Sequence, residues 1–205
     1  MSTDPPPGLY ARYGKRLLDL LSAAVLLVLL SPALALIALL IPLESPGPAL
    51  FRQERLGWRG RVFRIYKFRT MTHAARVPGH EIFGQDPDVT RLGRWLRRLK
   101  LDELPQLWNV LFGTMSLVGP RPALPQQLAE YDAAARRRLD VRPGLTGLAQ
   151  VAGNIYLTWP ERWAYDAQYV ERLSFGLDLW ILWRTLFVVV WGEARWRVAP
   201  TPKKD

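Results

Sequence analysis

An apolar segment near the N-terminus limits the folds open to this chain more than any other feature. Residues 20–43 contain no charged side chain and consist mainly of leucine, alanine, valine and isoleucine. A helix of roughly 24 residues, rising about 1.5 Å per residue, can cross the ~30 Å hydrocarbon layer of a bilayer. The segment is too long for the apolar core of a secretory signal peptide, and no small-residue cleavage site follows it. The sequence therefore predicts a protein inserted in a membrane.

Two details bear on how this segment enters the membrane. Ser31 and Pro32 lie near its middle, where proline removes a backbone hydrogen bond and kinks a helix. Basic residues lie on both flanks, with Lys15 and Arg16 before the segment and four arginines within residues 52–61 after it. A helix that enters one leaflet and returns keeps both flanks on the cytoplasmic side, as the positive-inside rule favours. A kinked spanning helix also accommodates the proline, so these residues alone leave both topologies open.

The charged residues at the start of the segment have two interpretations. Lys15, Arg16 and Asp19 lie within about one helical turn of each other. They can form an ordinary anchoring flank with one solvated aspartate. Alternatively, Lys15 and Arg16 bind the phosphates of lipid headgroups.

The composition narrows the classes of partner and of chemistry. The 205 residues carry a formal net charge of +10, which favours an anionic lipid surface, a phosphorylated substrate or a nucleic acid. The absence of cysteine excludes disulfides, thiolate catalysis and cysteine-ligated zinc, and the two histidines, His73 and His80, fit no zinc motif. Nine tryptophans favour a membrane–water interface. Because a nucleic-acid binder would not explain the apolar segment, we expect no nucleic-acid partner.

We expect a mainly helical α+β fold in four parts. These are a disordered lead-in at 1–12, the membrane helix at 13–47, a compact cytoplasmic domain at 48–192 and a polar tail at 193–205. Within the domain, the residue patterns predict a strand at 62–68, a loop at 72–88 and helices at 91–100, 124–141, 159–174 and 177–191. The first of these helices is amphipathic and strongly basic, which suits a membrane surface. The last, with three tryptophans, is predicted to lie in the membrane plane, and a second span remains the alternative.

Two adjacent carboxylates, Asp102 and Glu103, lie in a leucine-rich frame at the predicted start of a further helix. An aspartate at such a position is common as a helix cap, and Pro105 suits the first helical turn. A functional interpretation assigns the two carboxylates different tasks, because adjacent helical residues point about 100° apart. One can face a reacting phosphorus while the other holds Mg²⁺, which binds oxygen ligands. Candidate cations for neutralising a diphosphate are Lys67, Arg97 and Arg121.

The chain resembles the bacterial sugar transferases, the monotopic polyprenyl-phosphate phosphoglycosyltransferases, in their small single-domain form. The resemblance extends from about Tyr13 to Val190. It is carried by ordered motifs: Lys-Arg with a following Asp at 15–19, Ser-Pro at 31–32, Pro-Ala-Leu-Phe-Arg-Gln at 48–53, Tyr-Lys-Phe-Arg-Thr-Met at 66–71, Leu-Asp-Glu-Leu-Pro-Gln at 101–106, Ser-Leu-Val-Gly-Pro-Arg-Pro at 116–122 and Arg-Pro-Gly-Leu-Thr-Gly at 142–147.

The resemblance implies an activity and assigns residues to it. A sugar 1-phosphate passes from a UDP-sugar to undecaprenyl phosphate, UMP is released, and the product enters surface glycan or glycoconjugate assembly. Asp102 corresponds to the nucleophile that forms a covalent phosphosugar intermediate, and Glu103 to the carboxylate that supports Mg²⁺. The Ser31-Pro32 pair corresponds to the break of a re-entrant helix. The substrate-binding candidates are Lys67, Arg69, Arg97, Arg121 and Arg142.

The resemblance also implies a place in the bacterial inner membrane, with the catalytic domain facing the cytoplasm, and leaves a homodimer open. Three positions depart from the usual pattern. Lys100 stands where many members have serine or threonine, while Asn154 and Asp88 stand where arginine is usual. Two alternatives remain at this stage. Asp102 can act as a base or metal ligand in direct transfer, or the chain can be a non-catalytic membrane scaffold.

Overall fold

The computed structural model describes residues 8–72 and 88–192. In chain order the elements are the π-helix η1 (Tyr10–Gly14), helix α1 (Lys15–Glu44), strand β1 (Leu50–Leu56), the 3₁₀-helix η2 (Trp58–Gly60), strand β2 (Val62–Phe68), helix α2 (Arg91–Arg98), the 3₁₀-helix η3 (Leu101–Gln106), helix α3 (Leu107–Leu111), strand β3 (Ser116–Val118), the 3₁₀-helix η4 (Pro125–Glu130), helix α4 (Ala133–Arg136), the 3₁₀-helix η5 (Arg137–Asp140), strand β4 (Gly144–Thr146), helix α5 (Leu148–Ala152), the 3₁₀-helix η6 (Asn154–Tyr156), helix α6 (Trp159–Arg172) and helix α7 (Phe175–Trp191). The mainly helical α+β class is confirmed.

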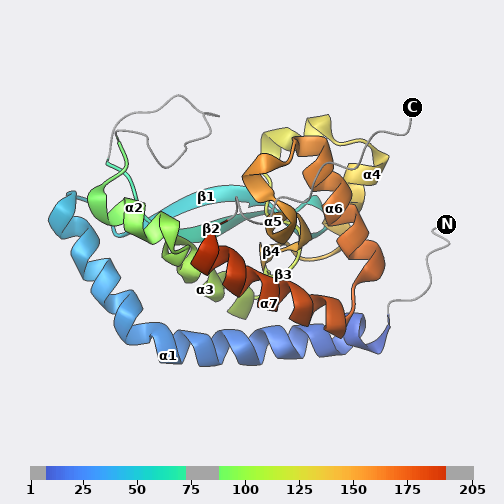
Figure 1. Ribbon diagram of the computed structural model, residues 1–205, viewed down its shortest axis with the longest axis horizontal. Helices are drawn as coiled ribbons and strands as arrows, with labels where there is room; N and C mark the ends of the chain where they lie inside the picture. Colours follow the sequence, from blue (N-terminus) through green and yellow to red (C-terminus); the bar gives the residue numbers. More distant parts are fainter. Residues whose placement is uncertain (1–7, 73–87, 193–205) are drawn as a thin grey trace.

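The apolar segment forms one long helix, α1, that bends part-way along its length (Figure 1). Helical structure continues through Pro32, so the expected helix–break–helix is instead a bent, continuous helix. Proline offers no N–H to the carbonyl of Val28, and the Ser31 hydroxyl donates to that carbonyl at 2.8 Å instead. Within the described residues, Tyr10–Glu44 is the one helical stretch long and apolar enough to cross a membrane.

The N-terminal end of α1 is fixed to the rest of the protein by three charged side chains. Lys15 forms a buried ion pair with Asp178 of α7, with 2.6 Å between Nζ and Oδ2. Arg16 donates to the carbonyls of Val110 and Leu111, which end α3. Asp19 accepts a hydrogen bond from the backbone N–H of Leu117 in β3 at 3.0 Å.

The C-terminal end of α1 is held just as firmly, but by different elements. The Glu44 carboxylate accepts hydrogen bonds from the backbone N–H groups of Arg91 and Leu92, at the N-terminus of α2. Arg69, directly after β2, donates to backbone carbonyls of residues 45–47 and so satisfies groups that a helix end leaves unpaired. Both ends of α1 therefore contact the same domain.

Two small sheets form the rest of the framework. β1 and β2 pair antiparallel, with Phe51 opposite Lys67. β3 and β4 pair in parallel, and their ends approach closely at glycine residues. A Cβ on Gly144 would lie 2.1 Å from the Gly119 nitrogen, so a larger residue cannot be accommodated there without moving the backbone. The glycines of the Gly-Pro-Arg-Pro and Arg-Pro-Gly motifs thus allow the two turns to pack together.

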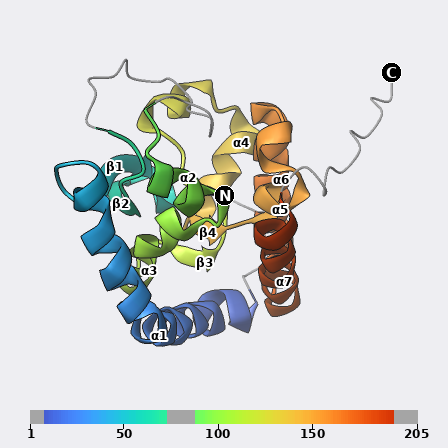
Figure 2. The same cartoon turned by 60° about the vertical axis from the view of Figure 1, so that its left-hand side comes forward.

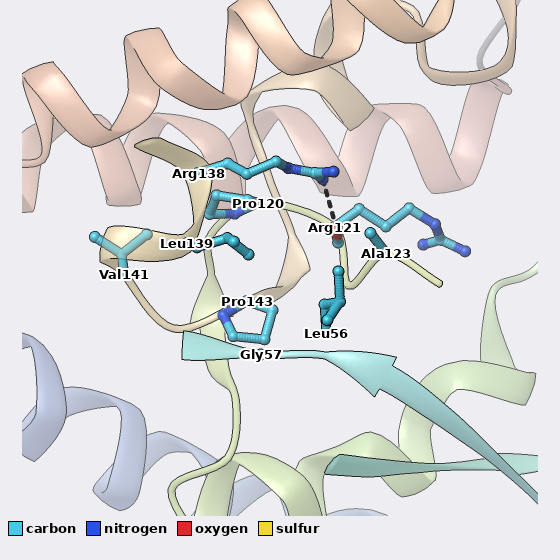
Figure 3. A pocket seen from close by; sticks show the side chains of 9 residues that line it. All are labelled: Leu56, Gly57, Pro120, Arg121, Ala123, Arg138, Leu139, Val141 and Pro143. Atoms are coloured by element: carbon cyan, nitrogen blue, oxygen red, sulfur yellow. Dashed lines mark hydrogen bonds between the residues drawn. The ribbon is translucent and has the colours of Figure 1, made fainter. Parts of the chain in front are cut away.

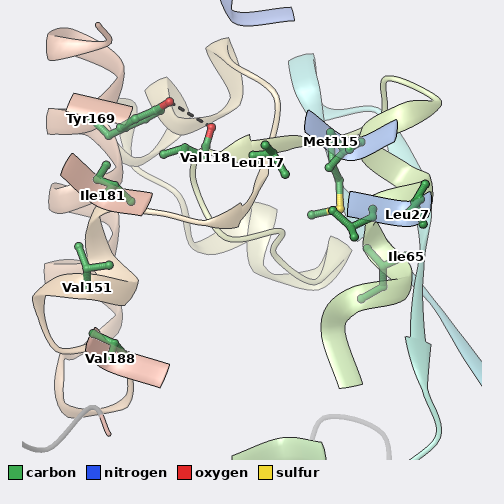
Figure 4. Packing of buried hydrophobic residues seen from close by; sticks show 12 residues of the cluster. Leu27, Ile65, Met115, Leu117, Val118, Val151, Tyr169, Ile181 and Val188 are labelled. Carbon is green, nitrogen blue, oxygen red and sulfur yellow. Dashed lines mark hydrogen bonds between the residues drawn. The ribbon is translucent and has the colours of Figure 1, made fainter. Parts of the chain in front are cut away.

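The main core joins α1, the sheets and the C-terminal helices. Leu27 of α1, Ile65 of β2 and Met115 pack into the same cluster as Tyr169 of α6 and Ile181 of α7 (Figure 4). The Tyr169 hydroxyl donates to the Val118 carbonyl at 3.0 Å. Seen from a second direction, α1 and α7 lie on different sides of the region that contains β3 and β4 (Figure 2).

Several sequence-based boundaries differ from the structure. The predicted helix at 124–141 is three short segments, η4, α4 and η5. The chain is extended at Tyr131, and the Asp132 side chain accepts from the Ala135 N–H to begin a new helix there. Helical structure also begins at Tyr10, inside the predicted lead-in. The predicted strand at 62–68 and the predicted helices α6 and α7 are confirmed. Most of the predicted loop at 72–88 and the tail at 193–205 lie outside the described residues.

Candidate active site

The two adjacent carboxylates lie in the first turn of η3, a 3₁₀-helix that leads directly into α3. The sequence predicted a helix start at this point, and the structure gives it the tighter 3₁₀ form. Lys100 precedes η3 in the left-handed conformation, with φ 56° and ψ 17°. Pro105 is buried within η3.

Glu103 is enclosed by two cations from distant parts of the chain. Its Oε1 lies 2.6 Å from Nζ of Lys67 and 2.8 Å from a guanidinium nitrogen of Arg121. Its Oε2 accepts a longer bond of 3.3 Å from Arg121. Burial alone would raise the pKa of this carboxyl, but the positive charges of Arg121 and Lys67 outweigh it and hold the pKa well below its usual value. Glu103 is therefore a fixed negative charge.

Asp102 has a different environment from its neighbour. Within the described residues, no hydrogen bond or ion pair reaches its carboxylate. Burial and the charge of Glu103 raise the pKa of Asp102 above its usual value. The cations Lys67, Lys100 and Arg97 oppose this rise. An anionic oxygen without a hydrogen-bond donor is available to attack an electrophile.

Lys67 is brought to Glu103 by the β1–β2 hairpin. The hairpin is fixed to α3 by the buried Asn109, whose Oδ1 accepts from the Tyr66 N–H at 3.1 Å and whose Nδ2 donates to the Arg64 carbonyl at 2.8 Å. The sequence analysis gave Asn109 no role. A buried asparagine in a leucine-rich helix was the signal, since buried amides nearly always have hydrogen-bond partners.

Arg138 holds the backbone of Arg121 in place. A guanidinium nitrogen of Arg138 donates to the Arg121 carbonyl at 2.7 Å (Figure 3). The same nitrogen lies 2.7 Å from the buried Asp166 of α6. Arg138 also donates to the Tyr131 hydroxyl. A cavity of about 10 Å³, the size of one water molecule, lies beside the Pro120–Arg121 turn. The sequence analysis missed this pair, because nothing local connects positions 138 and 166.

Arg97 joins the site through α2. Its Nε donates to the Thr70 hydroxyl at 2.9 Å, and its charge acts on Asp102. α2 approaches this region closely at Gly93, where a Cβ would lie 2.1 Å from the Thr70 carbonyl oxygen. The structure therefore brings together Lys67, Arg97 and Arg121 around the two carboxylates.

An apolar cavity of about 820 Å³ extends from Glu103 to the space between α1 and α7. Glu103 and Arg121 line one part of it. Leucine, valine and tryptophan side chains make up most of the remaining wall, including Leu21 and Val25 of α1 and Leu186 of α7. Asn154, one of the departures from the family pattern, also lines this cavity.

Other candidate residues lie elsewhere in the structure. The Arg69 guanidinium is buried on the carbonyls that follow α1. Arg142 donates to the Gly113 carbonyl at 2.9 Å and packs over the Trp58 ring. Lys15 and Arg16 make the α1 contacts described above. In the structure all four side chains are engaged with the protein itself. The backbone carbonyl of Asp88 accepts a hydrogen bond from the Thr72 N–H.

The donor set fits a metal that arrives together with phosphate. No group of three or more His, Cys, Asp or Glu side chains suited to a metal occurs within residues 8–72 and 88–192. Mg²⁺ commonly needs only one or two carboxylates, because substrate phosphates and water complete its shell. Glu103 meets that requirement, since among the described residues its Oε2 has a single, long hydrogen bond, from Arg121.

Comparisons with known proteins agree with this geometry. A family model for the bacterial sugar transferases matches residues 10–192. The chain belongs to the bacterial sugar transferase family. It is 46% identical over 193 residues to the UDP-glucose:undecaprenyl-phosphate glucose-1-phosphate transferase of Caulobacter vibrioides, a match covering 89% of this chain and 72% of that protein.

Two further relatives differ in length. The chain is 41% identical over 179 residues to the uncharacterized sugar transferase EpsL of Bacillus subtilis, with 87% of this chain and 88% of that protein covered. It is 44% identical over 193 residues to the undecaprenyl-phosphate glucose phosphotransferase of Komagataeibacter xylinus, and the match covers 84% of this chain and 35% of that protein. Family membership confirms that this sugar transferase is an enzyme, as the motifs predicted.

Proposed function

We propose that this sugar transferase moves a sugar 1-phosphate from a UDP-sugar to undecaprenyl phosphate, releasing UMP, as the first membrane step of surface glycan or glycoconjugate assembly. The observation that carries this proposal is the contrast within the carboxylate pair. Glu103 is held by Lys67 and Arg121, whereas Asp102 receives no hydrogen bond from the described residues. The Caulobacter and Komagataeibacter relatives are named for this class of transfer.

The mechanism follows from the separate roles of the two carboxylates. A carboxylate oxygen of Asp102 attacks the phosphorus that bears the sugar, and the bond from that phosphorus to the bridging oxygen of the diphosphate breaks. UMP leaves with the electron pair, and an acyl phosphosugar remains on Asp102. An oxygen of undecaprenyl phosphate then attacks the same phosphorus, which forms the lipid diphosphate sugar and restores the Asp102 carboxylate. A covalent intermediate thus divides the transfer into two steps.

The surrounding charges prepare Asp102 for the first step. Lys67, Lys100 and Arg97 each favour its ionised form. Arg121, whose guanidinium side chain is 42% exposed, can meet phosphate oxygens on its open side. Glu103 would hold Mg²⁺, and the ion would supply positive charge that neutralises diphosphate oxygens.

The contacts of α1 support a re-entrant, monotopic topology. A straight helix of 30 residues is about 45 Å long, and in a spanning arrangement its ends would lie on opposite sides of the bilayer. Here, one end is bound to α3 and α7 and the other to α2, all within one domain. Both ends therefore lie on one face of the membrane. The positive-inside rule favours the cytoplasmic face of the bacterial inner membrane.

The test is release of UMP by purified full-length protein supplied with undecaprenyl phosphate, Mg²⁺ and a panel of UDP-sugars. We expect UMP from one donor or a few, and none from the Asp102→Asn variant. No UMP with any donor, together with no binding of labelled UDP-sugars, would support a non-catalytic scaffold. Whether the enzyme forms a homodimer stays a prediction, tested by light scattering of the same preparation.

A further inference from the structure

Lys100 has an unusual backbone for its residue type. Its φ of 56° and ψ of 17° place it in the left-handed region, which residues other than glycine rarely occupy. It lies between the end of α2 and the first turn of η3, two residues before Asp102. Backbone strain of this kind is common next to functional sites and directs attention to the side chain.

The surroundings of Lys100 are apolar on one side and anionic on the other. Lys100 lines the 820 Å³ cavity together with its neighbours Leu99 and Leu101. Leu99 is exposed, and Trp95 on the preceding turn is 61% exposed. Toward the carboxylates, its charge favours the ionised form of Asp102. Lysine suits such a boundary, because its methylene stem packs on apolar surface while its ammonium group reaches a polar one.

The cavity itself matches a ligand with an anionic head and a hydrocarbon tail. Its apolar walls come from α1 and α7, the helix that enters the membrane and the helix rich in exposed tryptophan. Its charged part contains Lys100, Arg121 and the Glu103 carboxylate, which is already paired with Arg121 and Lys67. A volume of about 820 Å³ is in the range of sites that enclose small molecules, roughly 300–1,000 Å³. A UDP-sugar is polar throughout and would leave most of the apolar lining from α1 and α7 without a matching contact.

We propose that Lys100 binds the phosphate of the polyprenyl phosphate acceptor, whose first isoprene units occupy the cavity between α1 and α7. This inference rests on the proposed function and assigns Lys100 mainly to the second step, in which the acceptor oxygen attacks the phosphosugar on Asp102. Lysine binds phosphate as a compact, mobile charge, which accommodates an acceptor that slides in the membrane plane.

Two substitutions separate charge from backbone conformation. Lys100→Gly removes the charge and favours the left-handed conformation, so the fold is preserved or stabilised. Lys100→Arg keeps the charge. The matched control is Arg98→Ala, which removes an exposed cation that packs over Trp95 on α2 and does not line the cavity. All variants are measured as full-length protein in nanodiscs.

Two readouts are compared: the KM for undecaprenyl phosphate at saturating UDP-sugar, and the burst of UMP without acceptor. We expect Lys100→Gly to raise the acceptor KM about tenfold, the effect of one hydrogen bond to a charged group. The UMP burst should change much less than the acceptor KM, because Lys67 and Arg97 still favour the ionised form of Asp102. Lys100→Arg should restore the KM to within about threefold of the unsubstituted enzyme, corresponding to less than 1 kcal/mol. Arg98→Ala should resemble the unsubstituted enzyme.

Three results would overturn this inference. The first is an acceptor KM in Lys100→Gly equal to that of Arg98→Ala. The second is an equal loss of the UMP burst and the acceptor-dependent rate, which would assign Lys100 to donor binding. The third is a defect of Lys100→Gly confined to binding of anionic phospholipid vesicles, which would assign Lys100 to lipid headgroups. Absence of any UMP from the unsubstituted enzyme would instead contradict the proposed function itself.

Discussion

Two ion pairs with the same distance between their charged atoms, one buried and one partly buried, have different surroundings in this protein. Lys15 and Asp178 lie 2.6 Å apart where α1 meets α7, and Lys67 and Glu103 lie 2.6 Å apart beside η3. Asp178 also accepts hydrogen bonds from the hydroxyls of Tyr10 and Tyr169, at 2.6 and 2.7 Å. Each charged group and hydroxyl of that cluster has a hydrogen-bond or ion-pair partner within the protein.

The Glu103 site contains a second carboxylate, which has no hydrogen bond among the described residues. Directly beside the clamped carboxylate is Asp102, which no described residue hydrogen-bonds, and the apolar cavity reaches the same site. The comparison teaches that a buried ion pair alone does not identify an active site. What distinguishes the proposed catalytic site is Asp102, a neighbouring carboxylate that no described residue hydrogen-bonds.

The largest expected effect is the loss of the unpartnered carboxylate. Asp102→Asn removes the nucleophile while changing few contacts, so we expect UMP release to fall by about 10⁴-fold or more with an almost unchanged melting temperature. UMP release and thermal unfolding are measured on the same preparation. If Asp102→Asn retained a tenth of the UMP release, the proposed difference between the Glu103 site and the Lys15–Asp178 pair would be wrong.

Glu103→Gln should affect both activity and stability. It leaves the Lys67 ammonium and the Arg121 guanidinium without a full counter-charge. Because the Arg121 side chain is 42% exposed, solvent reduces the cost below the roughly 3–5 kcal/mol expected for a fully buried pair. We expect a fall in kcat of about a hundredfold or more and a lower melting temperature. Steady-state kinetics and calorimetry test this, with Asp102→Asn as the matched variant. Loss of activity with full stability would mean that Glu103 is not clamped as described.

At the α1–α7 pair, substitution should reduce stability without reducing catalysis per folded molecule. Lys15→Met leaves Asp178 buried without its cation, which we expect to cost about 3–5 kcal/mol. The double variant Lys15→Met, Asp178→Leu should recover part of that loss, because it removes both charges. Titration with a UDP-sugar gives the amount of folded protein, and a UMP assay then gives the turnover per folded molecule. A hundredfold fall in kcat of fully folded Lys15→Met would contradict a purely structural role.

The smallest expected effect concerns a third pair, Arg138 and Asp166, which supports Arg121. Burial raises the pKa of Asp166 to about 6, although the neighbouring Arg138 opposes the rise. Between about pH 4 and pH 6 the folded protein therefore binds more protons than the unfolded chain. The Asp166 contribution to the free energy of unfolding decreases as pH rises through that interval, by at most about 3 kcal/mol. Asp166→Asn should lack this dependence. If the free energy of unfolding changed with pH in the same way in the unsubstituted protein and in Asp166→Asn, the assigned role of Asp166 would be wrong.

Local patterns in the sequence predicted the elements and much of the site. The uncharged run at 20–43, the alternation at 62–68 and the tryptophan-rich stretch at 177–191 each correspond to one observed element. The charged motifs predicted Lys67, Arg97 and Arg121 as neighbours of the carboxylates, and the structure confirms that proximity.

Long-range contacts could not be predicted in the same way. Lys15 and Asp178 are 163 residues apart, and no periodicity connects them. The helix expected at 124–141 is divided because Asp132 caps a new helix, which local hydrophobic patterning does not show. Similarly, Arg69 lies two residues after Lys67, and strand alternation alone would place both side chains on one side. Strand β2 ends at Phe68, and the Arg69 guanidinium instead donates to the Pro46 carbonyl just after α1.

The most direct test of the central claim is intact and peptide mass spectrometry of the enzyme after incubation with its UDP-sugar in the absence of undecaprenyl phosphate. The account predicts one phosphosugar mass added to the peptide that contains Asp102, at close to one per enzyme and in step with UMP release. Addition of undecaprenyl phosphate should remove it, and Asp102→Asn should never acquire it. Rapid turnover with acceptor, but neither adduct nor UMP burst without it, would contradict the nucleophilic role of Asp102 and establish direct transfer.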